Sequence, residues 1–273
     1  KGSFAQLHPV EYGAQTLLGV LARVPQLRPE DIGDVIMGCA MPFGVQGGNM
    51  ARLIVQRAGL PDCVTAQTVN RYCSSGLQTI ATAANAIRCG EEDVVIAGGV
   101  ESMSLVPMLV GAEDADPWLA EHRPEVYTTM GITAENVARQ WGISRADMDA
   151  MAVESHRRAA QAQAGGCFDG QIIPITVPGP DGGEVVVCRD EGIRPGTTAE
   201  TLAGLKPCFL ENGSVTAATS SQMTDGAGFV VLMSEEKAAE LGVKPLARFV
   251  SFATGGVPAE VMGVGPIEAV PKA

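Results

Sequence analysis

Cys73 stands where a cysteine could act as a nucleophile. Residues 64–70 (VTAQTVN) alternate in polarity and are rich in β-branched side chains, which predicts a strand, and a small-residue helix is predicted over residues 74–89. Cys73 thus lies at the entrance of a helix, where unpaired amide N–H groups and the helix dipole stabilise a thiolate. The Ser-Ser-Gly that follows keeps the first turn small, so a reacting group can approach the backbone. The residues alone leave two interpretations open, a nucleophile or a packing residue.

The other six cysteines show weaker signals for chemistry. Cys89 falls at the opposite end of the predicted helix, where the dipole disfavours a thiolate. The remaining five fall near turns or strand ends and are interpreted as structural: Cys39, Cys63, Cys167, Cys188 and Cys208. An odd total of 7 cysteines without a CxxC pair predicts neither a disulfide framework nor a metal site. It indicates a reducing, cytoplasmic setting.

A cysteine nucleophile needs a positioned base, and the chain has 3 histidines. His8 precedes a proline at a predicted helix start, His122 lies in a charged loop, and His156 lies on an amphipathic helix. Each is interpreted as a solvated surface residue. None of them is an obvious partner for Cys73.

The composition excludes several classes of function. A net charge of −12 argues against nucleic acid or an anionic membrane as a partner, because both bind basic patches. The sequence contains no run of 18 apolar residues, so it predicts no membrane-spanning helix. The 33 glycines, which follow no collagen-like period, predict tight loops and close approach of the backbone to a ligand.

Short strands alternate with helices over residues 1–102, and the pattern of a buried strand returns at 226–234. This alternation predicts an α/β fold with a mixed sheet between helices. We predict one layered domain made of residues 1–102 and 223–273, with an inserted α+β domain at 103–222. Residues 246–256 (LARFVSFATGG) are predicted as a further strand.

Long motifs of the chain are similar to those of the thiolases, the enzymes that make or cleave 3-ketoacyl-coenzyme A. The stretch VNRYCSSGLQTIATAANAIRCGEEDVVIAGGVESMS resembles their nucleophile segment. The resemblance continues, in family order, through MGITAENVARQWGIS, DEGIRPGTT, LAGLKPCF and MGVGPIEAV. It covers nearly the whole chain and implies the layered thiolase-like fold, with the insertion as the coenzyme-A-binding loop domain.

The resemblance also implies site residues. Cys73 matches the nucleophile that becomes acylated, and Met130 matches the methionine beside the acyl group. Arg194 matches a residue near the adenine end of coenzyme A, while Thr201 and Ser221 stand where relatives place serines that contact the coenzyme. Coenzyme A is then a substrate, with no permanently bound cofactor, and acyl-CoA esters are the partners.

Two departures from the family pattern stand out. Relatives usually read Ala-Gly-Asn where this chain has Ala217-Ala218-Thr219, which adds a Cβ near the expected coenzyme path. The family's second half, with its Asn-Glu-Ala-Phe, Gly-His-Pro and Cys-x-Gly segments, does not occur within residues 1–273. The resemblance therefore implies a base outside these residues, little activity for a protein that ends at residue 273, and a homodimer or homotetramer.

The expected reaction is thiolytic cleavage of a 3-ketoacyl-CoA through a Cys73 acyl-enzyme, or the reverse condensation. The motif sequences are most similar to those of degradative 3-ketoacyl-CoA thiolases, which implies a role in fatty acid β-oxidation. Three alternatives stay open: a biosynthetic acetoacetyl-CoA thiolase, a ketoacyl synthase of the same fold, and a non-catalytic half that binds coenzyme A or assembles with another subunit.

Overall fold

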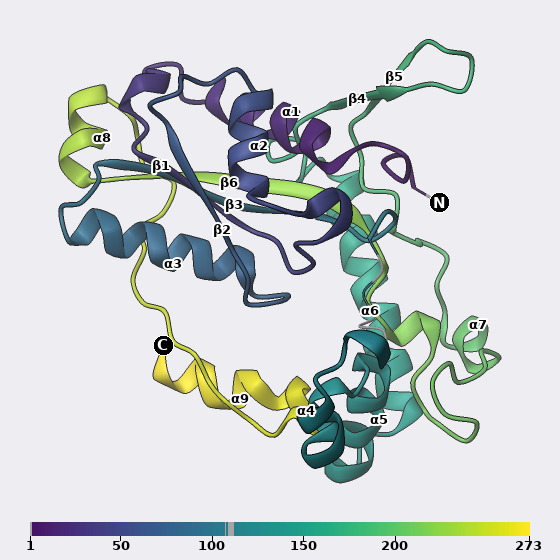
Figure 1. The fold of residues 1–273 in the computed structure, drawn as a ribbon. Coiled ribbons are helices and arrows are strands. Elements are labelled where there is room, and N and C mark those ends of the chain that lie inside the picture. Colours follow the sequence, from purple (N-terminus) through teal and green to yellow (C-terminus); the bar gives the residue numbers. More distant parts are fainter. Residues whose placement is uncertain (1, 107, 109–111) are drawn as a thin grey trace. The chain divides into compact units, whose positions relative to one another are not determined.

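The computed structural model describes residues 2–106, 108 and 112–273 (Figure 1). The chain forms two compact units, each described here by itself. Unit 1 comprises Lys1–Met108, Ile172–Arg189 and Met223–Val250, and unit 2 comprises Leu109–Gln171, Asp190–Gln222 and Ser251–Ala273. Residues 172–189 thus fall in unit 1 and residues 251–273 in unit 2, whereas the predicted domain division groups them the other way. That division stays a prediction.

Unit 1 is built on a mixed four-stranded sheet with the strand order β2-β1-β3-β6. Its strands are β1 (Asp34–Gly38), β2 (Thr65–Val69), β3 (Val94–Ser102) and β6 (Asp225–Met233). β1 pairs in parallel with β2 and with β3, and β6 is antiparallel to β3. Gly38 lies opposite both Val69 and Gly99, so the carboxyl ends of β1 and β2 coincide. The predicted mixed sheet is confirmed.

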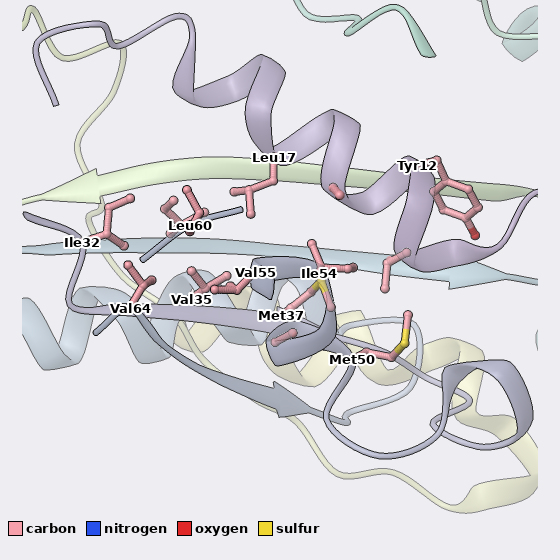
Figure 2. Close-up of a cluster of buried hydrophobic side chains, with 14 of the residues drawn as sticks. Tyr12, Leu17, Ile32, Val35, Met37, Met50, Ile54, Val55, Leu60 and Val64 are labelled. Carbon is pink, nitrogen blue, oxygen red and sulfur yellow. The ribbon is translucent and has the colours of Figure 1, made fainter. Parts of the chain in front are cut away.

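Helices cover both faces of this sheet, as Figure 1 shows. They are α1 (Pro9–Leu21) and α2 (Met50–Arg57) on one face, α3 (Ser75–Arg88) on the other, and α8 (Glu235–Leu241) after β6. Successive strand residues point to opposite faces. Val35 and Met37 therefore join the core under α1 and α2, and Ile36 joins a second cluster with Ala83 of α3. Figure 2 shows the larger cluster.

A short hairpin of β4 (Ile175–Pro178) and β5 (Glu184–Val187) also belongs to unit 1. Ile175 and Val177 are buried in the larger core cluster, and the Gln15 side chain of α1 binds both backbone groups of Thr176. These contacts place a segment of the predicted insertion in unit 1. The predicted strand over residues 246–256 is wrong, since this segment forms no strand. A strand needs a neighbouring strand to pair with, and this segment has no such partner among the described residues.

Unit 2 is mostly helical. Its helices are α4 (Pro117–His122), α5 (Met130–Trp141), α6 (Arg145–Ala164), α7 (Ala199–Ala203) and α9 (Gly265–Ala269). Its 3-10 helices are η3 (Ala112–Asp114), η4 (Pro124–Tyr127), η5 (Ala217–Thr219), η6 (Ala259–Val264) and η7 (Val270–Lys272), and unit 1 holds η1 (Pro29–Asp31) and η2 (Gly44–Gln46). No helix of the described residues is long and apolar enough to cross a membrane.

Gly38 allows α3 to lie close to β1. A Cβ atom at this position would lie 2.6 Å from the Cβ of Ser75 and 2.8 Å from the backbone nitrogen of Gly76. Real Cβ contacts of this kind do not occur, so a side chain here would push the first turn of α3 away. The small residue at the end of β1 is therefore a condition for the position of α3.

We predict that Gly38→Ala destabilises unit 1 by about 1–3 kcal/mol, since overpacking forces the backbone to shift. Hydrogen exchange of the β1 and α3 amides measures the free energy of opening. Gly228→Ala in β6 is the matched control, because a Cβ there would meet nothing within 4 Å. Equal protection of β1 and α3 in both variants would contradict the prediction.

Candidate active site

Cys73 is exposed in the tight turn between β2 and α3. The preceding residue, Tyr72, has a φ of 47°, the one left-handed backbone conformation at a non-glycine residue in the described part of the chain. Such a conformation costs about 1–3 kcal/mol and persists only where the surroundings enforce it. Because the Tyr72 side chain is 68% exposed, its own packing does not supply that enforcement.

Ser75, the first residue of α3, ties the turn to the helix. Its hydroxyl donates to the Tyr72 carbonyl at 2.6 Å and accepts the Arg71 N–H at 2.8 Å. Its own N–H donates to the same Tyr72 carbonyl at 3.0 Å. The side chain is 4% exposed. A buried hydroxyl at the helix entrance thus holds the backbone on both sides of the left-handed residue.

The helix entrance is left without a side-chain cap. Ser74 occupies the N-cap position of α3, yet it makes no capping hydrogen bond, and its hydroxyl donates back to the Arg71 carbonyl at 2.9 Å. A serine at this position usually accepts an amide N–H of the first turn. A negatively charged group can therefore approach these amides, which point out of the end of the 14-residue helix that follows Cys73.

The position of α3 is fixed against the sheet. The Thr79 hydroxyl, fully buried, donates to the carbonyl oxygens of Gly76 in α3 and Gly98 in β3, at 2.7 and 3.1 Å. The face of α3 that packs against the sheet is buried, whereas Leu77, elsewhere on the same helix, is 59% exposed. The small, nearly uncharged residues of this helix serve the close contact on a single face.

Cys39 provides a contrast to Cys73 within the same unit. It directly follows β1, is 1% exposed, and lies 3.8 Å from Oε1 of Glu101. Burial, assisted by the negative charge of Glu101, raises the pKa of the Cys39 thiol to about 12. Cys39 is therefore a protonated packing residue near neutral pH, as the sequence predicts for a structural cysteine.

The three histidines all have local contacts. His8 is the N-cap of α1 and accepts the Val10 N–H at 3.3 Å. His122 stacks on the Trp118 ring with 4.6 Å between ring centroids. His156 accepts the N–H of Arg194 at 3.2 Å through Nδ1, which places the proton of the neutral ring on Nε2.

The other predicted site residues all belong to unit 2. Met130 begins α5 and is 43% exposed, and Arg194 is held through its backbone by His156. Thr201 closes a capping box with Thr198 at the start of α7. Ser221 is exposed between η5 and β6. Within the described residues of unit 2, no hydrogen bond joins these four predicted side chains to one another.

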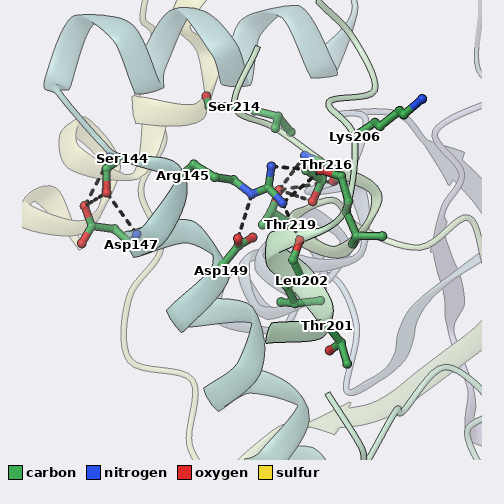
Figure 3. A network of polar contacts seen from close by, with 12 residues as sticks. Ser144, Arg145, Asp147, Asp149, Thr201, Leu202, Lys206, Ser214, Thr216 and Thr219 are labelled. Carbon is green, nitrogen blue, oxygen red and sulfur yellow. Dashed lines mark hydrogen bonds and ion pairs between the residues drawn. The ribbon is translucent and has the colours of Figure 1, made fainter. Parts of the chain in front are cut away.

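Arg145 holds the helix that carries Thr201. Its guanidinium donates to Asp149 at 2.8 Å and to the Leu202 carbonyl of α7 at 2.6 Å (Figure 3). Asp149 is only 6% exposed, so the carboxylate of this ion pair is shielded from water. The contact fixes α7 against α6, an arrangement that the sequence does not reveal.

Glu135 is a further anchor that the sequence analysis missed. The carboxylate, 7% exposed, accepts the N–H groups of Ser214 and Val215 at 2.9 and 2.8 Å and the Ser214 hydroxyl at 2.9 Å. A Cβ at Gly213 would lie 2.3 Å from Oε1, so the loop can approach only with glycine there. Burial acts to raise the pKa of Glu135, but these hydrogen bonds outweigh it and hold the pKa below its ordinary value.

The loop that Glu135 holds leads into η5, where the chain departs from the family pattern. The Thr216 N–H donates to the Thr219 hydroxyl at 2.9 Å, and this capping box closes the short helix. Thr219 thus supplies a local turn contact from the position at which the family resemblance implies an asparagine. Among the described residues, no group of three His, Cys, Asp or Glu side chains could hold a metal ion.

A family model described as the thiolase N-terminal domain matches residues 1–236. The chain belongs to the thiolase family. This confirms the resemblance seen in the motifs, and it makes the protein an acyltransferase of a family that takes coenzyme A as a substrate without a permanently bound cofactor.

Individual thiolases match along the whole chain. A 3-ketoacyl-CoA thiolase of Bacillus subtilis (strain 168) is 51% identical over 281 residues, and an acetyl-CoA acetyltransferase of Cupriavidus necator is 42% identical over 284 residues. Each match covers 100% of this chain and 72% of the relative. The crystal structure of the Bacillus anthracis acetyl-CoA acetyltransferase superposes with a TM-score of 0.89 at 40% identity, over 99% of this chain and 71% of that one. The layered thiolase fold is thereby confirmed.

We predict that iodoacetamide at pH 8 labels Cys39 at least ~100-fold more slowly than Cys73 in the native thiolase chain. A buried thiol with a pKa of about 12 is almost wholly protonated at pH 8, and the reagent cannot reach it. Mass spectrometry of the two peptides measures both rates, and labelling in urea is the control in which the difference should vanish. Comparable native rates would show the prediction to be wrong.

We also predict that Glu135→Gln lowers the free energy of unfolding of unit 2 at pH 7 by about 1–3 kcal/mol, since buried amides lose a charged acceptor. Because the folded pKa is depressed, the stabilisation is present above the ordinary value of 4.5 and is lost as the pH falls through the lower folded value. Both tryptophans, Trp118 and Trp141, lie in unit 2, so urea unfolding followed by their fluorescence reports on this unit.

Wild type and Glu135→Gln should therefore converge as the pH falls below 4.5 and through the lower folded pKa. The exposed Glu154, which pairs with Arg157 and Arg158, provides the control substitution Glu154→Gln. A surface pair of this kind contributes little to the free energy of unfolding, because water and salt screen it. A constant gap between wild type and Glu135→Gln from pH 7 to pH 3 would contradict the assigned role.

Proposed function

We propose that Cys73 is the nucleophile of this thiolase and forms the acyl-enzyme. The thiolate attacks C3 of a 3-ketoacyl-CoA, the bond between C2 and C3 breaks, and its electron pair passes to C2. Protonation of C2 releases acetyl-CoA. The thiolate of coenzyme A then attacks the thioester, which releases the shortened acyl-CoA and restores the Cys73 thiolate. The observation that supports this role is the exposed thiol beside the uncapped first turn of α3.

The first turn of α3 stabilises the charge that develops in this reaction. In our proposal the N–H of Cys73 supplies one donor to the oxyanion of the tetrahedral intermediate, as the family resemblance implies. Removing one such donor typically costs about 10²–10³ in rate. Gly76 supports the assignment, because a Cβ there would meet nothing within 4 Å, which leaves space for a substrate. The family resemblance implies a histidine base and a second cysteine as acid–base group, and the proposal assigns neither role to a residue of this chain.

Unit 2 supplies the proposed contacts to coenzyme A. The family resemblance implies that Met130 contacts the acyl group, that Arg194 contacts the adenine end, and that Thr201 and Ser221 contact the coenzyme between them. The Thr201 hydroxyl already donates to the Thr198 carbonyl at 2.8 Å, so it would meet the coenzyme as an acceptor. The chain's Ala218, in place of the family's glycine, would narrow the coenzyme path by one methyl group.

The proposal also covers the location, the reaction direction and the assembly of the protein. We infer a cytoplasmic, degradative thiolase of fatty acid β-oxidation that works as a homodimer or homotetramer, with the loop domain at 103–222 inserted between 1–102 and 223–273. The 51% identity to a protein named 3-ketoacyl-CoA thiolase favours the degradative direction. A biosynthetic acetoacetyl-CoA thiolase is the second candidate, favoured by the 42% identity to an acetyl-CoA acetyltransferase.

We predict that Cys73→Ala in the full-length protein lowers kcat for coenzyme-A-dependent cleavage by at least ~10³, because the covalent route is lost. Incubating the wild type with a 3-ketoacyl-CoA should leave an acyl mass on the Cys73 peptide. Cys63→Ala, at another exposed cysteine, is the control and should keep full activity. An acyl group on a different residue would overturn the assignment, and coenzyme A binding without any acylation would favour a non-catalytic half.

A further inference from the structure

Asn70 joins the turn of Cys73 to a neighbouring loop. The Tyr72 N–H donates to Oδ1 of Asn70 at 2.8 Å, and Nδ2 of Asn70 donates to the carbonyl oxygen of Ala40 at 3.1 Å. The first contact is the asparagine turn that closes on the backbone two residues onward. The second reaches the segment that follows β1. A single side chain thus bridges the left-handed residue before Cys73 and the end of the adjacent strand.

The Ala40 peptide is itself fixed by a carboxylate. Glu101, near the end of β3, accepts the N–H of Ala40 at 2.7 Å and the N–H of Met41 at 3.2 Å. The fully buried Gln46 donates to the same carboxylate at 2.8 Å. Hydrogen bonds to a charged acceptor are the stronger kind. The acceptor that Asn70 finds on Ala40 is therefore held in place from the core of the sheet.

The left-handed conformation of Tyr72 needs support from two sides. Ser75 holds the Tyr72 carbonyl from the helix, and Asn70 holds the Tyr72 N–H from the strand. A non-glycine residue at a φ of 47° relaxes to an ordinary conformation when such contacts are removed. A change of φ at Tyr72 redirects the next residue, which is Cys73.

We propose that Asn70 is the positioning residue of Cys73, anchored through Ala40 to the Glu101 carboxylate. Asn70 keeps Tyr72 in the left-handed conformation, and this turn presents the thiol at the first turn of α3. The inference rests on the proposed role of Cys73 as the nucleophile. Asn70 is exposed, so removing its side chain leaves no cavity in the core.

The test compares Asn70→Ala with Asn70→Ser in the full-length protein. Alanine removes both hydrogen bonds, whereas a serine hydroxyl can still accept the N–H two residues onward. We expect Asn70→Ala to slow iodoacetamide labelling of Cys73 about tenfold at pH 8, and to lower kcat ~10–100-fold with an unchanged KM for coenzyme A. Asn70→Ser should stay within about threefold of wild type. Asn85→Ala, at an exposed asparagine of α3, is the matched control and should change neither quantity.

A double-mutant cycle with Tyr72 tests the mechanism. Glycine adopts a positive φ without steric cost, so Asn70→Ala should slow labelling by less than about threefold in a Tyr72→Gly background. An undiminished tenfold loss in that background would overturn the proposal. Wild-type labelling and kcat in Asn70→Ala would overturn it too.

The labelling readout separates this inference from the proposed function. If the wild type shows no acylation of Cys73 while labelling still depends on Asn70 and Tyr72, the function fails and the positioning of the thiol stands. If acylation occurs and labelling is independent of Asn70, the positioning role fails alone. Should Asn70→Ala not fold, Asn70→Leu, which has nearly the shape of asparagine but makes neither hydrogen bond, takes its place in the same cycle with Tyr72→Gly, with the same expected and contradicting outcomes.

Discussion

The close contact between the first turn of α3 and the carboxyl end of β1 is the constraint on which the turn of Cys73 depends. Gly38 leaves no room for a Cβ, and Ser75 fills the space instead. The strand register places Gly38 opposite Val69, so the chain leaves β2 beside this contact. Five residues then separate Val69 from the helix. That short span forces a sharp turn, and the left-handed Tyr72 is the residue that makes it.

Two cysteines that follow neighbouring parallel strands meet opposite environments. Cys39 comes directly after β1 and stays in the interior, where burial and Glu101 keep it protonated. Cys73 comes four residues after β2 ends, and the turn lifts it out to solvent at the helix entrance. The same residue type is therefore suited to packing in one place and to covalent chemistry in the other. Glu101 contributes to both, since it faces Cys39 and fixes Ala40.

Patterns local in sequence predicted most of unit 1. The alternating strand and the small-residue helix with Cys73 at its entrance are both confirmed, because each depends on neighbours within a few residues. Long-range pairing decided the rest. Residues 246–256 have a strand-like pattern but no ladder partner, and the 172–189 segment joins unit 1 because Ile175 and Val177 enter its core. The anchors at Glu135 and Arg145 join segments about 60–80 residues apart, and no local pattern marks such partners.

The sequence by itself determined the family, the mixed α/β fold and the position of Cys73 between a strand and a helix. Motif order and residue spacing along the chain are enough for these conclusions. Only the tertiary structure decided that Cys39 is buried and Cys73 exposed, how Tyr72 turns the chain, and which side chains hold that turn. These features depend on Gly38, Ala40 and Glu101 meeting residues 70–75 in space. Folding creates such contacts between distant segments, because burying apolar residues on both faces of the sheet aligns the strand ends.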